Sequence, residues 1–208
     1  MSDVLWKPTT ERVENANVTS FRRWVNDKHG LDLQSFTALY DWSVDQAEKF
    51  WPALIEYTDL KAETWGERAL IDGNKMPGAQ FFPDARLNFA ENLLVRDDNT
   101  DALVFWGEDK VKTRLSWAEL NIAVSRFSQA LRAEGVGKGD RVCGYMPNMG
   151  ETVIALLATA AIGATWSSAS PDFGVQGVVD RFGQIEPTVM ITVDGYHYNG
   201  KQHDIREK

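Results

Sequence analysis

The sequence contains little of what marks secreted or membrane-spanning proteins. Cys143 is the only cysteine in 208 residues, so no internal disulfide can form, and this is typical of a reducing compartment. We expect its thiol to be buried in a strand as core. The first residues, MSDVLWKPTTER, lack the basic and apolar regions of a secretory signal. No run approaches the roughly 18 apolar residues of a membrane span. These absences predict a soluble, cytoplasmic protein with no membrane partner.

Basic side chains are also scarce. The chain has 22 Lys and Arg against 30 Asp and Glu, a formal net charge of −8. A nucleic-acid partner selects a basic stripe, so we expect none, although a local basic pocket for one phosphate is compatible with this balance. His29, His197 and His203 lack the spacing and the cysteine partners of a zinc site, so we expect no bound metal.

What the sequence does contain is a well-marked β-α-β unit from Gly135 to Ser170. A glycine-rich turn leads into a short strand over Val142–Met146. The helix predicted from Met149 to Ile162 is apolar on most faces, and Asn148 is its predicted N-cap. Thr165–Ser168 begins the next strand. Such a unit predicts an α/β fold with a parallel sheet.

The turn GVGKGD allows three interpretations. A phosphate loop needs a Ser or Thr after its lysine, but Gly139 and Asp140 follow Lys138. A dinucleotide fingerprint needs its glycines after a strand and before a helix, whereas these follow a helix and precede a strand. A plain helix-to-strand turn is therefore favoured, and a Rossmann oxidoreductase is disfavoured.

An aromatic-rich leader precedes this unit. Five of the 8 tryptophans lie before residue 70: Trp6, Trp24, Trp42, Trp51 and Trp65. We expect them to be anchors that pack short helices together rather than residues that bind a cofactor. Helices are predicted over residues 18–28, ending at Gly30, over residues 35–40, and after Ser43, which forms a capping box with Gln46. Residues 66–83 predict a loop with one short strand at 69–71.

A further short helix is predicted after Asn88, its N-cap. A composition shift near Asp97 then predicts a domain boundary, with the leader at 1–97 and an α/β domain at 98–208. The α/β domain begins with a predicted hairpin of Ala102–Trp106 and Val111–Leu115.

Ser116 and Glu119 predict a capping box at the start of the following helix. After the central unit we predict a helix over 173–184, capped by Asp172 or Ser170, and a last strand over 188–193. The remaining tail is polar.

The order of four segments carries a resemblance. LYDWSVDQAEKFW, LNFAENLL, LSWAELNIAVSRFSQALRAEGVGKGDRVCGYMPN and TAAIGATWSSASPDFG follow one another along the chain. Together they resemble the start of an acyl-CoA synthetase of the adenylate-forming enzymes. The leader is similar to that of acetyl-CoA and acetoacetyl-CoA synthetases, and ATWSSASPDFG favours the acetoacetyl-CoA type. The resemblance covers essentially the whole chain.

This resemblance implies a two-step acid–CoA ligase. A carboxylate, here acetoacetate, attacks the α-phosphate of ATP with Mg²⁺ to give an acyl-adenylate and diphosphate. Coenzyme A then takes the acyl group and AMP leaves. The family's phosphate loop, ribose-binding motif and C-terminal lysine lie downstream of Lys208, so the resemblance places the ATP and Mg²⁺ sites outside this chain and assigns it no catalytic residue.

The resemblance also implies cofactor-binding residues for coenzyme A. Ser170, Pro171 and Asp172 match a segment that approaches its adenine end. Lys201 matches a basic position near its 3′-phosphate, and Tyr198 falls where an arginine is often found. A solvated tail lysine is the alternative for Lys201.

Two other functions stay open on the sequence. The same reaction on acetate, propionate or another short acid is a close alternative, because the acyl pocket is built downstream. A non-catalytic interaction module is the alternative if the natural chain ends at Lys208.

Overall fold

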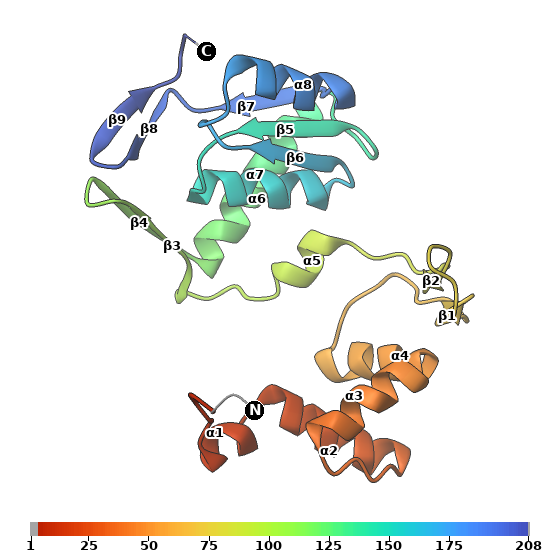
Figure 1. Cartoon of the computed structure of the whole chain (residues 1–208). Coiled ribbons are helices and arrows are strands. Elements are labelled where there is room, and N and C mark those ends of the chain that lie inside the picture. Colours follow the sequence, from red (N-terminus) through yellow and green to blue (C-terminus); the bar gives the residue numbers. More distant parts are fainter. Residues whose placement is uncertain (1–3, 208) are drawn as a thin grey trace. The chain divides into compact units, whose positions relative to one another are not determined.

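The computed structural model describes residues 4–207. The chain forms two compact units, one ending at Leu87 and the other beginning at Asn88 (Figure 1). Each unit has its own core of apolar side chains. The second unit confirms the predicted α/β class, because its parallel strands are connected through helices.

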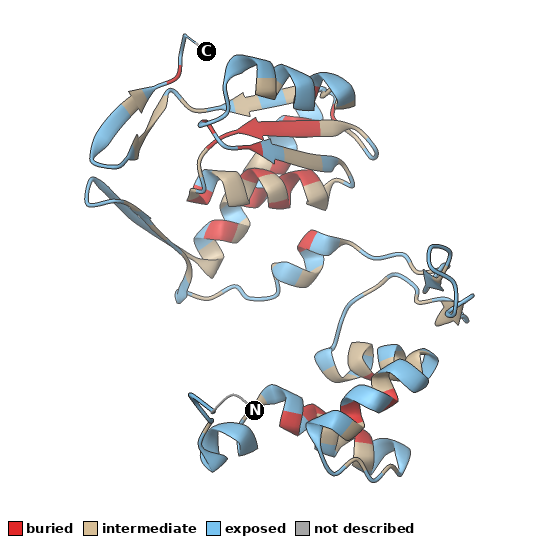
Figure 2. Ribbon diagram, viewed as in Figure 1, coloured by how far each residue is buried: buried red, intermediate tan, exposed pale blue. Residues whose placement is uncertain are grey.

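The first unit consists largely of short helices packed through aromatic side chains. They are α1 (Thr10–Glu14), α2 (Asn17–His29), α3 (Phe36–Asp45) and α4 (Ala47–Thr58). Buried residues on α2, α3 and α4, drawn red in Figure 2, form one cluster: Phe21, Val25, Leu39, Trp42 and Ala53. The ring of Phe50 meets Phe21 and Trp42 edge-on, with centroids 5.9 and 5.7 Å apart. Edge-on contacts suit the ring quadrupoles, which explains why aromatics serve as packing here.

One predicted cap in this unit is correct and one is wrong. Gly30 ends α2 in the left-handed region, at φ 62°, as predicted. Ser43, however, opens no helix. It lies inside α3, where its hydroxyl donates to the Tyr40 carbonyl at 2.6 Å. Helix α4 begins after Gln46, whose side chain makes no capping bond. The predicted capping box is wrong because α3 continues through Ser43.

The loop predicted after residue 66 contains a small ribbon. Strand β1 (Leu70–Ile71) pairs antiparallel with β2 (Gln80–Phe81). The first of these strands was predicted, and its partner was not.

The second unit opens with α5 (Phe89–Leu93), capped by Asn88 as predicted. The Asn88 side-chain oxygen accepts from the Ala90 amide at 2.9 Å, and its side-chain nitrogen donates to the Ala160 carbonyl at 3.0 Å. Asn88 therefore fastens α5 to α7 (Gly150–Ala161). By these contacts α5 belongs to the second compact unit. The domain boundary at residue 97 stays a prediction.

The predicted hairpin and capping box follow. Strands β3 (Asp101–Gly107) and β4 (Val111–Ser116) pair antiparallel. Helix α6 (Trp117–Ala133) begins with both bonds of the box: the Glu119 amide donates to the Ser116 hydroxyl at 3.2 Å, and the Ser116 amide donates to the Glu119 carboxylate at 2.9 Å. These local bonds confirm the prediction.

A three-stranded parallel sheet forms the centre of the second unit. Its order is β6 (Thr165–Ala169), β5 (Arg141–Tyr145), β7 (Val189–Thr192). The turn GVGKGD joins α6 to β5, so the helix-to-strand interpretation is confirmed. Tyr145 pairs with Ala169 on one side and with Thr192 on the other, so the carboxyl ends of the strands lie level.

Helices cover both faces of this sheet, as Figure 1 shows. Val142 packs with the apolar side chains of α6 and α7. Cys143 and Tyr145 point to the other face, where they pack with Phe182 of α8 (Val175–Ile185). Alternation along β5 therefore supplies two cores from one strand.

Two predicted caps in this region are wrong. The N-cap of α7 is Met149, without a side-chain bond, because the helix begins one residue later than Asn148 could cap. The N-cap of α8 is Gly174, so neither Ser170 nor Asp172 caps that helix. Both lie in the loop before it.

The strand predicted over 188–193 is not the last, because the polar tail contains two further strands. Strands β8 (Gly195–Tyr198) and β9 (Lys201–Asp204) form a hairpin around Asn199 and Gly200, whose φ angles are 52° and 73°. Positive φ at both central residues is what a tight hairpin needs, and Asn-Gly is the residue pair that supplies it. The signal was present in the sequence at this place.

Asn88 offers a test of how α5 is held. We expect Asn88→Ala to lower the free energy of unfolding by about 1–3 kcal/mol, because it removes both the cap and the bond to Ala160. Asn88→Ser keeps a capping oxygen but is too short to reach Ala160, so it should cost less. Urea unfolding followed by circular dichroism compares them. Equal losses for Ala and Ser would show that the cap contributes nothing.

Cys143 is a second test, because burial raises its pKa to about 11. The folded thiol keeps its proton above pH 9, where an unfolded thiol loses it, so stability should fall as pH rises from about 9 to 11. At pH 8 we expect Ellman's reagent to label the thiol in guanidinium but not in buffer, with Cys143→Ala as the blank. Fast labelling of the folded protein would contradict this burial.

Candidate functional site

The predicted site residues lie on two segments of the second unit. Ser170, Pro171 and Asp172 directly follow the carboxyl end of β6. Tyr198 and Lys201 flank the turn between β8 and β9. Open α/β sheets place ligands outside the carboxyl ends of their strands, and the first segment stands at such an end.

The first segment exposes two of its three residues. Pro171 is buried, whereas Ser170 and Asp172 are exposed. The Ser170 hydroxyl donates to the Asp172 carboxylate at 2.9 Å, and the Asp172 amide donates back to that hydroxyl at 3.3 Å. The side chains of this segment that a ligand can reach are therefore the Ser170 hydroxyl and the Asp172 carboxylate, which are hydrogen-bonded to each other.

Tyr145, at the end of β5, holds the backbone of this segment through its hydroxyl group. Its hydroxyl lies 2.8 Å from the Pro171 carbonyl and 2.6 Å from the Phe173 carbonyl, and its single proton is shared between these two acceptors. A buried tyrosine hydroxyl normally finds such partners. Pro171 thus contributes to the site through its backbone and its place in the core.

The second segment presents one face of a hairpin. Tyr196 pairs with His203, and Tyr198 pairs with Lys201, so these four side chains share a face. The rings of Tyr196 and His203 are stacked, with centroids 5.0 Å apart and planes 19° from parallel. Tyr198 and Lys201 are exposed near the tip.

Tyr196 joins the two segments, although it was not among the residues predicted from the sequence. Its hydroxyl donates to the Asp172 carboxylate. This bond to the Asp172 carboxylate raises the pKa of Tyr196 to about 12, because loss of the phenol proton would break the bond and set two like charges side by side. The bond brings the segment after β6 to the base of the hairpin. Tyr196 and Asp172 are 24 positions apart in the sequence, and no local sequence pattern predicts their contact.

A second contact holds the tip of the hairpin. The Gly200 amide donates to both carboxylate oxygens of Glu108, at 3.0 and 3.2 Å. Glu108 lies in the turn between β3 and β4, so the two hairpins meet at their turns. Lys201 therefore directly follows Gly200, whose amide is already bound to the Glu108 carboxylate.

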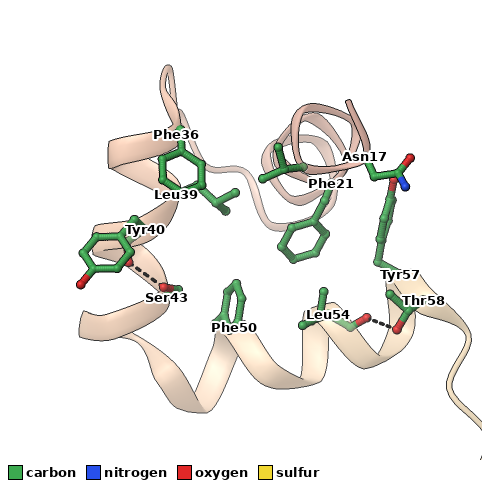
Figure 3. A pocket seen from close by; sticks show the side chains of 11 residues that line it. Asn17, Phe21, Phe36, Leu39, Tyr40, Ser43, Phe50, Leu54, Tyr57 and Thr58 are labelled. Carbon is green, nitrogen blue, oxygen red and sulfur yellow. Dashed lines mark hydrogen bonds between the residues drawn. The ribbon is translucent and has the colours of Figure 1, made fainter. Parts of the chain in front are cut away.

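The first unit contains a hollow of different character. A groove of about 330 Å³ lies among α2, α3 and α4, and Figure 3 shows side chains of Phe21, Leu39, Phe50 and Leu54 directed into it. The residues that line this groove include no charged side chain. Because none of its lining side chains is a cation, the groove offers a nucleotide phosphate no charge-assisted bond.

No three His, Cys, Asp or Glu side chains of residues 4–207 gather as a metal ion would require. None of the helices in this range is long and apolar enough to span a bilayer.

Two known families match parts of this chain. The family described as AMP-binding enzyme matches residues 91–208, more than half of the chain. The chain belongs to this family. A second family, described as acetyl-coenzyme A synthetase N-terminus, matches residues 36–93. The resemblance seen in the four sequence segments is thereby confirmed.

Several relatives within the AMP-binding family are acetoacetyl-CoA synthetases. An acetoacetyl-coenzyme A synthetase of Rhizobium meliloti (strain 1021) is 53% identical over 204 residues, which cover 98% of this chain and 31% of the relative. An acetoacetyl-CoA synthetase of Danio rerio is 40% identical over 211 residues, covering 100% and 31%. The solved acetoacetyl-CoA synthetase from Streptomyces lividans superposes with a TM-score of 0.93 at 45% identity, covering 99% of this chain and 32% of that one.

The chain therefore spans about a third of the length of these relatives. It is a homologue of acetoacetyl-CoA synthetases and corresponds to the N-terminal portion of them. The helical aromatic leader and the β-α-β units match this part of the acyl-CoA synthetase fold.

Proposed function

We propose that this chain forms the N-terminal part of an ATP-dependent ligase that joins acetoacetate to coenzyme A. The reaction yields acetoacetyl-CoA, AMP and diphosphate through an acyl-adenylate. The observation that carries the proposal is the 53% identity to an acetoacetyl-coenzyme A synthetase over 98% of the chain. In this proposal the residues that bind ATP and Mg²⁺ lie in segments outside the given sequence. No residue of the given sequence is assigned a bond-making step.

Within this chain, the proposal assigns one end of coenzyme A to the site described above. The exposed ammonium of Lys201 meets the 3′-phosphate, for which a cation on a long, flexible stem is suited. Tyr198 stands beside it and offers a hydroxyl. It supplies no positive charge, so Lys201 carries the electrostatic part of the contact.

The loop after β6 suits the adenosine of coenzyme A. Asp172 is anionic and would repel a phosphate, but a carboxylate and the Ser170 hydroxyl accept well from the neutral N–H and O–H donors of an adenosine. Pro171 between them is buried, whereas both of these side chains lie at the surface. These charges support the proposal that the phosphate binds at the hairpin and the nucleoside at the loop.

The reaction is tested with the protein expressed from its natural reading frame. We expect acetoacetate to support exchange of labelled diphosphate into ATP, and coenzyme A to release AMP. Acetate and propionate, assayed in parallel, address the close alternative. Higher kcat/KM with either of those acids would replace acetoacetate as the substrate. Absence of exchange with any short acid would overturn the ligase proposal.

The coenzyme A site is tested by Lys201→Ala. We expect KM for coenzyme A to rise roughly tenfold, because a charge-assisted bond to phosphate is lost, while KM for 3′-dephospho-coenzyme A stays unchanged. Lys138→Ala is the matched control, since this exposed lysine precedes β5 at the opposite end of the strands. Equal effects on both forms of coenzyme A would show that Lys201 does not meet the 3′-phosphate.

A further inference from the structure

The hairpin that carries Lys201 is not part of the central sheet. Strands β8 and β9 pair only with each other within residues 4–207, in a sheet of their own. A lone two-stranded hairpin is marginally stable in water. Its position relative to the loop after β6 therefore depends on side-chain contacts.

Those contacts lie at both ends of the hairpin. At the base, Ile205 is buried with Cys143, Tyr145 and Phe182, which anchors the end of β9 to the core. At the tip, the Gly200 amide is bound by Glu108. Neither contact touches Ser170 or Asp172. Tyr196 supplies a bond between hairpin and loop, from its hydroxyl to the Asp172 carboxylate.

Three features hold the Tyr196 hydroxyl in place. The ring is partly buried against the core of α8 and β5, and its face is stacked on His203. The accepting carboxylate is oriented by the Ser170 hydroxyl on its other oxygen. Ring, carboxylate and hydroxyl thus form a continuous chain from the hairpin to the loop.

We propose that Tyr196 is a positioning residue for coenzyme A: its bond to Asp172 sets the spacing between the loop that meets the nucleoside and the hairpin that meets the 3′-phosphate. This inference rests on the proposed coenzyme A site. Tyr196 itself touches no substrate in it. Two contacts with one rigid ligand reinforce each other only when the groups that make them are held at the matching distance.

Adenosine 3′,5′-bisphosphate is the probe, because it carries both parts of the ligand. Its affinity is measured by calorimetry on the protein expressed from its natural reading frame. We expect Tyr196→Phe, which keeps the ring and its stacking, to weaken binding roughly tenfold, the size of one lost bond to a charged group. Gln202→Ala, on the opposite face of the hairpin, is the control and should leave the affinity unchanged.

A double-mutant cycle separates positioning from general destabilisation. If Tyr196 acts by holding Lys201 at the right distance, then Lys201→Ala should cost much less in the Tyr196→Phe background than in the wild type. A structural role alone would leave the two effects additive. Peptide-level hydrogen exchange should also become faster over residues 195–204 in Tyr196→Phe, with the central sheet unchanged.

The outcomes distinguish the two proposals. Binding that Lys201→Ala weakens and Tyr196→Phe does not would overturn the positioning role and keep the coenzyme A site. Additive effects in the cycle would also overturn that role. Absence of binding by the wild type, or binding that Lys201→Ala leaves unchanged, would overturn the site and the positioning role together.

Discussion

Burial of β5 on both faces is the constraint on which the second unit depends. Val142 and Cys143 are adjacent in the strand, each is 0% exposed, and they face opposite sides of the sheet. Each face must therefore be covered by apolar side chains from elsewhere in the chain. Helices α6 and α7 cover one face, and α8 with Ile205 covers the other. The hairpin of β8 and β9 is thus tied to the same core as the loop after β6.

Features that depend on neighbouring residues could be predicted from the sequence. The β-α-β unit, the turn GVGKGD and the capping box of Ser116 and Glu119 are all decided within a few positions. The wrong caps at Ser43, Asn148 and Asp172 share another cause. Each of these residues has capping chemistry, but in the structure the helix starts at a later residue. A capping residue predicts a boundary only when the end of the preceding element is known.

The candidate site divides in the same way. The order of segments led to Ser170, Asp172 and Lys201 through a resemblance. It did not lead to Tyr196, whose partner lies 24 positions earlier. The hairpin was within reach of sequence reasoning through Asn199-Gly200, but its docking was not. Contacts between distant elements depend on three-dimensional packing, and a single sequence does not contain a local signal for it.

The meeting of Glu108 with the Gly200 amide joins two turns that are 92 positions apart. The length and shape of the first turn therefore constrain the second. Among homologues, a residue inserted between β3 and β4 would remove the carboxylate from the Gly200 amide and leave that amide open to another anion. The turn between β3 and β4 and the turn between β8 and β9 therefore constrain each other in length, because the carboxylate of one binds the backbone of the other.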